Sequence, residues 1–506
     1  MSLVTLPFKL STMYKLLSLL ILIAVNQAHA QSIESLQKDI KRHLIYLADD
    51  KLEGRRTGTP GEQKACDYIC KQFKKNKLTK PNGWDSYVQA FEVNEGKKPS
   101  DNNYIKSDSW TALCNKDFVP MPYSAQRNFS IHDLDEVSFV NLDEIADETA
   151  TNPHFDMEEK MYQLLSERSG ISNAKAIFLY SDKDSSISFD GKSKRNELPV
   201  VIIKCTRITT SKIKEILEKS GTIDIQVEIV PNVRTGHNVS GFVDNGAAQT
   251  IIIGAHYDHL GFGEDHNSLY TGSEKMIHNG ADDNASGTAS LISLSAILKK
   301  SGSKNFNYLF VAFSGEELGL YGSKYFSEHS PVDMKSVNYM INMDMVGRLN
   351  DSTHGLTVGG YGTSPAWGKL IDTADAYFHI KVDSAGIGPS DHTSFYKKDL
   401  PVLFFFTGTH HDYHKPSDDA DKINYEGAAR ISNYILNLIQ KTESLPKLTF
   451  TKTRDAVSTG KSSFKVTMGI MPDYTYSGNG VRVDGVSDNR PAQKAGILTC
   501  LLYTSD

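Results

Sequence analysis

The stretch Thr250-Ile251-Ile252-Ile253-Gly254-Ala255-His256-Tyr257-Asp258 decides the fold. It opens with a nearly continuous apolar run of strand length, and a histidine and an aspartate follow that run directly. Runs of this kind are typical of strands that helices cover on both faces of a sheet. The stretch therefore predicts a buried strand that carries polar side chains at its carboxyl end.

Three further apolar runs, at 308–313, 339–343 and 402–406, also predict buried strands. A helix is expected over 285–300, and a last helix places Ile431, Ile435 and Leu438 on one face. Strands that alternate with helices predict an α/β sandwich. Ligands in such sheets bind beyond the carboxyl ends of the strands.

Histidines and acidic residues gather at those strand ends. They are His256 and Asp258 after the first run, Glu316 and Glu317 after the second, Asp344 at the end of the third, His414 in the loop after the fourth, and Asp282 and Asp283 before the 285–300 helix. Burying so many carboxylates together is costly unless cations neutralise them. Mixed histidine and carboxylate ligands suit zinc, with manganese or cobalt as alternatives. A pair of metal ions would need a bridging carboxylate and could hold a bridging water.

Each piece is weak evidence by itself. A lone His-x-Asp is more often a polar pair, and two adjacent glutamates usually lie on a solvated helix start. Asp282 and Asp283 could cap a helix, since acidic residues favour helix N-termini. Their joint placement at strand ends and a helix start favours a metal site.

Five motifs resemble those of the aminopeptidase Y-type di-zinc metallopeptidase family, whose relatives include bacterial leucyl aminopeptidases and glutamate carboxypeptidase II. They are GAHYDHLG at 254–261, GADDNASG at 280–287, SGEELGL at 314–320, NMDM at 342–345 and DYHKPSD at 412–418. Residues 53–61 also resemble the N-terminal part of that family. The resemblance implies a three-layer α/β sandwich with a mixed central sheet.

The resemblance also implies a role for each matching residue. Asp283 would bridge two Zn²⁺ ions, with His256 and Asp344 completing one site and Glu317 and His414 the other. Glu316 would act as the general base on a metal-bridged water. Asp258 would accept a hydrogen bond from the free ring nitrogen of His256.

An oxyanion donor is expected beside the metals. Some relatives use a tyrosine just before the last histidine ligand, and Tyr413 holds that position here. Others place a tyrosine three residues before a Ser-Asp-His motif, and Ile387 stands at that position. Tyr413 is therefore the candidate donor, and a packed aromatic ring is the alternative.

The implied function is zinc-dependent hydrolysis of N-terminal peptide bonds, with peptide or protein N-termini as substrates. A related metallo-carboxypeptidase and a single-zinc glutaminyl cyclase are enzymatic alternatives. A non-catalytic, receptor-like binding protein on the same fold is a further alternative, although that class should have lost metal ligands.

Other segments complete the predicted organisation. Residues 1–30 have the basic start, apolar run and Ala28-His29-Ala30 site of a signal peptide, which predicts export to the periplasm or secretion, without a stable membrane span after cleavage. Residues 31–104 would begin the catalytic domain, which resumes over 231–445. Between them, 105–230 resembles a protease-associated insertion, which would border the active site. Residues 446–506 resemble a partial PDZ domain able to bind a peptide C-terminus if complete, and 499–506 depart from the expected continuation.

The bulk composition fits this interpretation. A length of 506 residues suggests about three domains. Lys and Arg total 55 against 61 Asp and Glu, a formal charge of −6, without the basic stripe of a nucleic-acid-binding protein. Nucleic acid is therefore excluded as an expected partner.

Overall fold

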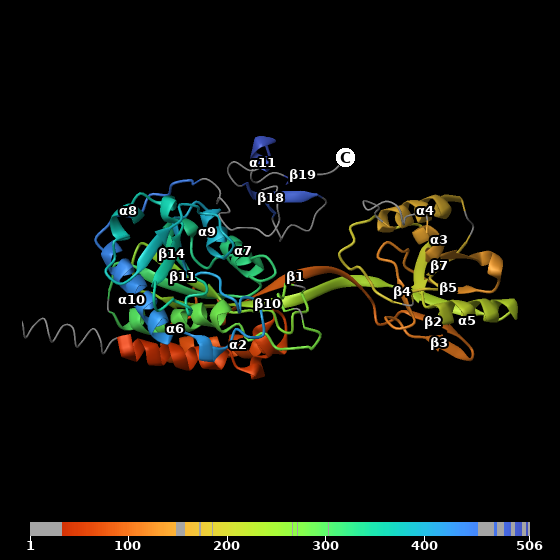
Figure 1. Cartoon of the computed structure of the whole chain (residues 1–506), viewed down its shortest axis with the longest axis horizontal. Helices are drawn as coiled ribbons and strands as arrows, with labels where there is room; N and C mark the ends of the chain where they lie inside the picture. The colour runs from red at the N-terminus through yellow and green to blue at the C-terminus, as the bar shows by residue number, and fades with distance from the viewer. Residues whose placement is uncertain are drawn as a thin grey trace, which may run out of the picture. The chain divides into compact units, whose positions relative to one another are not determined.

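The computed structural model describes residues 33–453, apart from 148–156, 172–173, 185, 266, 271 and 302. It also describes 470–472, 480–486, 491–497 and 502–503. The chain divides into two compact units, one of residues 1–91 and 235–506 and one of Glu92–Arg234. Figure 1 shows the elements of both units.

An eight-stranded sheet forms the centre of the first unit. The strands, in sheet order, are β1 (Val88–Pro99), β10 (Ile229–Val243), β12 (Asn307–Phe313), β11 (Thr250–His256), β13 (Val337–Met343), β16 (Val402–Phe406), β14 (Gly355–Gly359) and β15 (His379–Val382). The four strands from β12 to β16 are mutually parallel, whereas β10 and β14 run antiparallel to their neighbours β12 and β16. The sheet is mixed, as predicted, and four parallel strands end at one edge.

Helices cover both faces of this sheet, which gives three layers (Figure 1). Ile251 and Ile253 pack into the core formed by a helix over 33–47 and by α2, α6 and α10. Ile252 belongs to the opposite core, which contains Phe326 of α7 and Phe395 of α9. The helices are α2 (Pro60–Lys75), α6 (Gly287–Lys300), α7 (Tyr321–Glu328), α8 (Trp367–Leu370), α9 (His392–Tyr396) and α10 (Tyr425–Thr442). Alternate strand residues thus face different cores, which explains the continuous apolar runs.

The predicted fold class is confirmed, and the strand positions agree closely. The run at 402–406 matches β16, while β11 extends two residues beyond 254 to include His256. The 285–300 helix begins later, at Gly287, because residues 281–286 form the irregular segment η3. Short helical turns complete the unit: η1 (Asp50–Arg55), η4 (Met334–Ser336), η5 (Tyr361–Thr363) and η6 (Ala420–Lys422).

The second unit contains two four-stranded sheets. One has the order β3 (Trp110–Ala112), β2 (Tyr104–Ser107), β9 (Ile223–Val227), β5 (Arg127–Ile131), and the other β4 (Phe118–Pro120), β8 (Val201–Cys205), β7 (Ala176–Tyr180), β6 (Val137–Asn141). Its helices are η2 (Leu134–Glu136), α3 (Leu142–Asp147), α4 (Met157–Ile171) and α5 (Arg207–Glu218). The unit is wider than the 105–230 insertion expected from sequence, because its limits fall inside β1 and β10.

Several predicted segments lie wholly or partly outside the described residues. The signal peptide at 1–30 is one of them. Of the PDZ-like segment the structure describes β17 (Ile470–Pro472), β18 (Val481–Val486), α11 (Pro491–Lys494) and β19 (Leu502–Tyr503), with the three strands in one sheet. Among the described residues no helix has both the length and the hydropathy needed to cross a bilayer.

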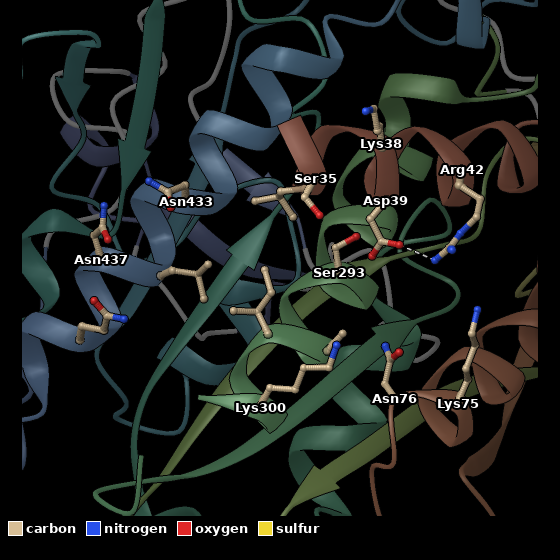
Figure 2. Close-up of a pocket in the computed structure, with 15 residues that line it drawn as sticks. Ser35, Lys38, Asp39, Arg42, Lys75, Asn76, Ser293, Lys300, Asn433 and Asn437 are labelled. Carbon is tan, nitrogen blue, oxygen red and sulfur yellow. Dashed lines mark hydrogen bonds and ion pairs between the residues drawn. The ribbon is translucent and has the colours of Figure 1, made fainter. Parts of the chain in front are cut away.

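A cavity of about 860 Å³ lies among the 33–47 helix, α2, α6 and α10 (Figure 2). Lys38, Lys75 and Lys300 line it from three of these elements, and Asn433 and Asn437 line it from α10. None of the predicted site residues lines this cavity.

Candidate metal centre

The carboxyl ends of the parallel strands bring the predicted site residues together. His256 is the last residue of β11, and Asp344 follows β13 directly. Glu316 and Glu317 lie in the turn after β12, and His414 lies in the loop after β16. Because these strands are parallel and adjacent, residues far apart in sequence meet at one edge of the sheet.

The first group of candidate ligands consists of His256, Asp283 and Asp344. The Nε2 atom of His256 lies 3.3 Å from Oδ1 of Asp344 and 3.4 Å from Oδ1 of Asp283. All three residues are buried, and one potential ligand atom from each lies within 4.8 Å of the others. A single cation between these atoms would be within reach of all three.

The second group lies on the other side of the Asp283 carboxylate. Nε2 of His414 is 3.3 Å from Oδ2 of Asp283 and 3.2 Å from Oε2 of Glu317. Asp283 therefore directs one oxygen to each group. This is the arrangement that a carboxylate shared by two cations requires.

His259 also reaches the second group, and the sequence interpretation had not assigned it a role. Its Nδ1 atom lies 2.6 Å from Oε1 of Glu317 and 4.0 Å from Oδ2 of Asp283. One potential ligand atom each of His259, Asp283 and Glu317 lies within 4.8 Å of the others. The signal was its position inside the 254–261 motif, but its reach to Glu317 depends on the path of the backbone after β11.

Asp258 lies beside the site, but its carboxylate has different partners from those expected. Nδ1 of His256 lies 3.2 Å from the backbone carbonyl of Asp258 and 3.7 Å from its carboxylate oxygen, so the carbonyl is the nearer acceptor. The carboxylate instead accepts from the hydroxyl of Thr57 at 3.0 Å and from the backbone N–H of Glu316 at 3.2 Å. Asp258 thus holds the turn that carries Glu316.

Further hydrogen bonds orient the ligand groups. Ser390 donates to Oδ2 of Asp344 at 2.7 Å, and Asn342 donates in turn to the Ser390 hydroxyl at 2.8 Å. A carboxylate oxygen of Asp418 accepts from the backbone N–H groups of Asp282 and Asp283, at 2.9 and 3.1 Å. These contacts leave Oδ1 of Asp344 and both oxygens of Asp283 facing the cluster, as expected of groups that orient metal ligands.

Arg55 hydrogen-bonds to the backbone segments that carry the site residues. Its guanidinium is buried and donates to the backbone carbonyls of Leu47, Tyr257, Asn279 and Gly280. Burial lowers its pKa to about 10, while the nearby carboxylates act in the opposite direction. Arg55 therefore joins the segment after β11 to the turn before Asp283.

The cluster is electrostatically unbalanced without a cation. Burial and the neighbouring Glu317 carboxylate raise the pKa of Asp283 to about 7. Burial likewise raises the pKa of Glu316 well above its ordinary value. Burial would lower the pKa of His414, but Glu317 and Asp283 raise it to about 11. The carboxylates thus draw positive charge to this point, which divalent cations can supply.

A cavity of about 200 Å³ opens onto the cluster. The five candidate ligands and Glu316 line it together with apolar and aromatic side chains, which include Met345, Pro389, Phe404, Phe406 and Tyr413. Oε2 of Glu316 lies 3.9 Å from Nε2 of His256. The ring of Tyr413 stacks on that of His414, with centroids 3.9 Å apart. A small substrate group in this cavity would contact both the cluster and Glu316.

The donor set fits zinc. Imidazole nitrogens and carboxylate oxygens are typical zinc ligands, and each group contributes three protein ligands. Hydrogen bonds to Asp344 and around Asp283 supply the outer contacts that such sites need.

Comparison with known protein families matches residues 238–439 to peptidase family M28. This part of the chain belongs to peptidase family M28. The matched residues include the five candidate metal ligands predicted from the sequence, and Glu316. The predictions of family and of a metallopeptidase are confirmed at this level.

The similarity to known proteins extends beyond residues 238–439. The chain is 23% identical over 454 residues to aminopeptidase YwaD of Bacillus subtilis, covering 83% of this chain and 90% of that protein. It is 25% identical over 250 residues to a probable leucine aminopeptidase of Arthroderma otae, covering 47% and 65%. Among solved structures, BSAP, a zinc aminopeptidase from Bacillus subtilis, has 19% identity and a TM-score of 0.46, covering 82% of this chain and 98% of that one.

Proposed function

We propose that this protein is a di-zinc aminopeptidase that hydrolyses the N-terminal peptide bond of peptides or proteins. The observation that carries the proposal is the Asp283 carboxylate, which directs one oxygen to each of two ligand groups. His256 and Asp344 would complete one zinc site, and Glu317 and His414 the other. When bound, the two zinc ions would polarise the peptide carbonyl and lower the pKa of water.

Glu316 is the proposed general base. Its carboxylate lines the cavity beside His256 without belonging to either ligand group. In the proposed reaction Glu316 takes a proton from the attacking water and transfers it to the nitrogen of the breaking C–N bond. The products are the free N-terminal amino acid and the shortened peptide with a new amino group. Tyr413 is the proposed hydrogen-bond donor to the oxyanion.

The charge of the cavity favours an amino group over a carboxylate as the substrate terminus. Carboxylates of Asp283, Glu316, Glu317 and Asp344 line it, whereas none of the described residues that line it is Lys or Arg. A carboxypeptidase needs a cationic group for the C-terminal carboxylate. The names of the similar aminopeptidases from Bacillus and Arthroderma support the same choice.

The walls of the cavity favour an apolar N-terminal side chain. Met345, Phe404 and Phe406 line it, and the rings of Phe404 and Phe406 stack with centroids 5.7 Å apart. A leucyl or phenylalanyl side chain would bury apolar area against them, whereas a lysyl or glutamyl side chain would lose hydration.

The test is a panel of chromogenic aminoacyl amides with leucyl, phenylalanyl, lysyl and glutamyl groups. Hydrolysis of the apolar members, its loss with a chelator and its recovery with zinc are expected. The N-acetylated leucyl amide is the matched control and should resist cleavage. Two zinc ions per chain are expected by elemental analysis. One ion per chain together with cyclisation of N-terminal glutamine would instead support the glutaminyl cyclase alternative, and two ions without turnover a binding protein.

Substitution Glu316→Gln tests the base directly. The side chain keeps its size but loses its proton-accepting carboxylate, so kcat should fall about 100- to 10,000-fold. Because Glu316 is not a proposed ligand, the variant should retain two zinc ions. Unchanged turnover with full metal content would contradict the assignment.

We also propose that the protein is exported and that its first 30 residues are removed. The basic start, the apolar run and the Ala28-His29-Ala30 site support this proposal. N-terminal sequencing of the mature protein from a periplasmic or secreted fraction should begin at Gln31. Mature protein that keeps its first residues would contradict it. We further propose that residues 105–230 form a protease-associated domain and that residues 446–506 form a partial PDZ domain.

A further inference from the structure

Glu317 is contacted through both of its carboxylate oxygens. Oε2 lies 3.2 Å from Nε2 of His414, on the side of the cluster that faces Asp283. Oε1 lies 2.6 Å from Nδ1 of His259, which is almost fully buried. The two histidines therefore occupy different sides of one carboxylate.

His414 is better placed than His259 to share a cation with Asp283. Its Nε2 is 3.3 Å from Oδ2 of Asp283, whereas Nδ1 of His259 is 4.0 Å from the same oxygen. His259 faces the oxygen of Glu317 that does not face His414. This difference separates a ligand position from a supporting position.

The other ring nitrogen of His259 indicates where the proton lies. Nε2 is buried and has no hydrogen-bond partner among the described residues. A neutral imidazole carries one N–H group and one lone pair. If the proton were on Nε2, a buried N–H would lack an acceptor, and this is less favourable than a buried nitrogen lone pair that lacks a donor. The proton is therefore on Nδ1, where the Glu317 carboxylate accepts it.

The backbone around the ring fixes this geometry. Gly280 adopts a positive φ of 52°, and a Cβ there would lie 2.4 Å from Cδ2 and 2.5 Å from Cγ of His259. The ring thus packs directly against glycine backbone, in the turn that leads to Asp283. A side chain at position 280 would clash with this ring and also with the backbone oxygen of Asp283, which lies 2.1 Å from the Cβ position.

We propose that His259 is a positioning residue that donates from Nδ1 to Oε1 of Glu317 and holds Oε2 towards the second metal site. The inference rests on the proposed di-zinc function and adds a residue to its second site. It predicts that His259 sets the affinity of one of the two sites and leaves the other unchanged.

The experiment measures zinc binding to the full chain, stripped of metal and titrated against a chromogenic zinc chelator. His259→Ala should weaken one of the two sites about 10- to 100-fold, the range found for groups that orient metal ligands, and should leave the other unchanged. His259→Asn places an amide N–H at the same number of bonds from Cα as Nδ1, so it should recover the affinity. His354→Ala, which removes a histidine stacked on Tyr377 outside the cluster, is the control.

Two results would overturn the inference. The first is His259→Ala binding both zinc ions as tightly as the unaltered protein. The second is His259→Asn losing as much affinity as His259→Ala, which would mean that an N–H donated to Glu317 is not what supports the site. Circular dichroism of each metal-free variant checks that the fold is kept. If the unaltered protein binds fewer than two zinc ions, the proposed function fails, whatever the variants do.

Discussion

Asp283 has opposite effects on the stability of the metal-free protein and on metal binding. Its carboxylate is buried among Glu317, Asp344 and two imidazoles, which is unfavourable for an anion without a cation. The same position gives each proposed metal one of its oxygens. We therefore expect that Asp283 lowers the unfolding free energy of the metal-free protein, although metal binding requires it.

Substitution Asp283→Asn should separate the two effects. The neutral amide removes one buried charge, so the metal-free variant should gain about 0.5–2 kcal/mol of unfolding free energy. It should also bind zinc more weakly at both sites, because one site loses its Asp283 oxygen and the other keeps only a neutral amide oxygen. Urea unfolding with chelator and zinc titration measure the two quantities. A variant that is less stable without metal would contradict the argument.

His43 gives the protein a separate sensitivity to acid. Its Nδ1 lies 2.8 Å from the hydroxyl of Tyr68, and burial lowers its pKa below the ordinary value, against the opposing effect of Asp39. Because the unfolded chain binds the proton first, stability should fall as the pH drops below about 6.5. In the metal-free protein His43→Gln should flatten the decline of melting temperature between pH 7.5 and 5.5. An unchanged pH profile would exclude this role for His43.

At the scale of elements, Arg55 connects three parts of the chain. Its guanidinium donates to the end of the 33–47 helix at Leu47, to the segment after β11 at Tyr257, and to the turn at Asn279 and Gly280. Arg55→Met would leave several buried carbonyls without donors, so a loss of about 3 kcal/mol or more is expected. Chemical denaturation measures it.

The matched control for Arg55 is Arg207→Met. Arg207 pairs with Asp182 at 3.3 Å, but its side chain is 67% exposed. A surface substitution of this kind should change stability by less than about 0.5 kcal/mol. Equal losses in the two variants would mean that the buried hydrogen bonds of Arg55 contribute little.

The strands and their ends could be predicted from the sequence, because a strand that is buried on both faces has a continuous apolar run such as 402–406. The gathering of the acidic and histidine side chains at one edge was expected for the same reason, since parallel strands bring their carboxyl ends together, whereas the role of each residue came from the family resemblance. The contacts of Arg55 and His259 were not, because they depend on backbone turns and on residues as distant as Gly280 and Glu317. The closer approach of the Asp258 carbonyl than of its carboxylate to Nδ1 of His256 also depends on a local turn, which the sequence pattern does not reveal.

At the scale of the whole molecule, the two units have separate cores. No core cluster of the described residues combines side chains from Glu92–Arg234 with side chains from the rest of the chain. We therefore expect two thermal transitions. Zinc at a hundredfold excess over its dissociation constant should add about 2.7 kcal/mol to the unit with the metal centre. Calorimetry with zinc and with chelator should shift one transition only; a common shift would mean that the units unfold together.

The place of β11 in the sheet has a consequence for proteolysis. Both neighbours of this strand, β12 and β13, come later in the chain, beyond the exposed Met276. A single cut beside Met276 would place His256 on one fragment and Asp283, Glu317, Asp344 and His414 on the other. Because β11 stays hydrogen-bonded between two strands of the second fragment, the nicked protein should remain one particle on gel filtration. It should separate only when the sheet is denatured.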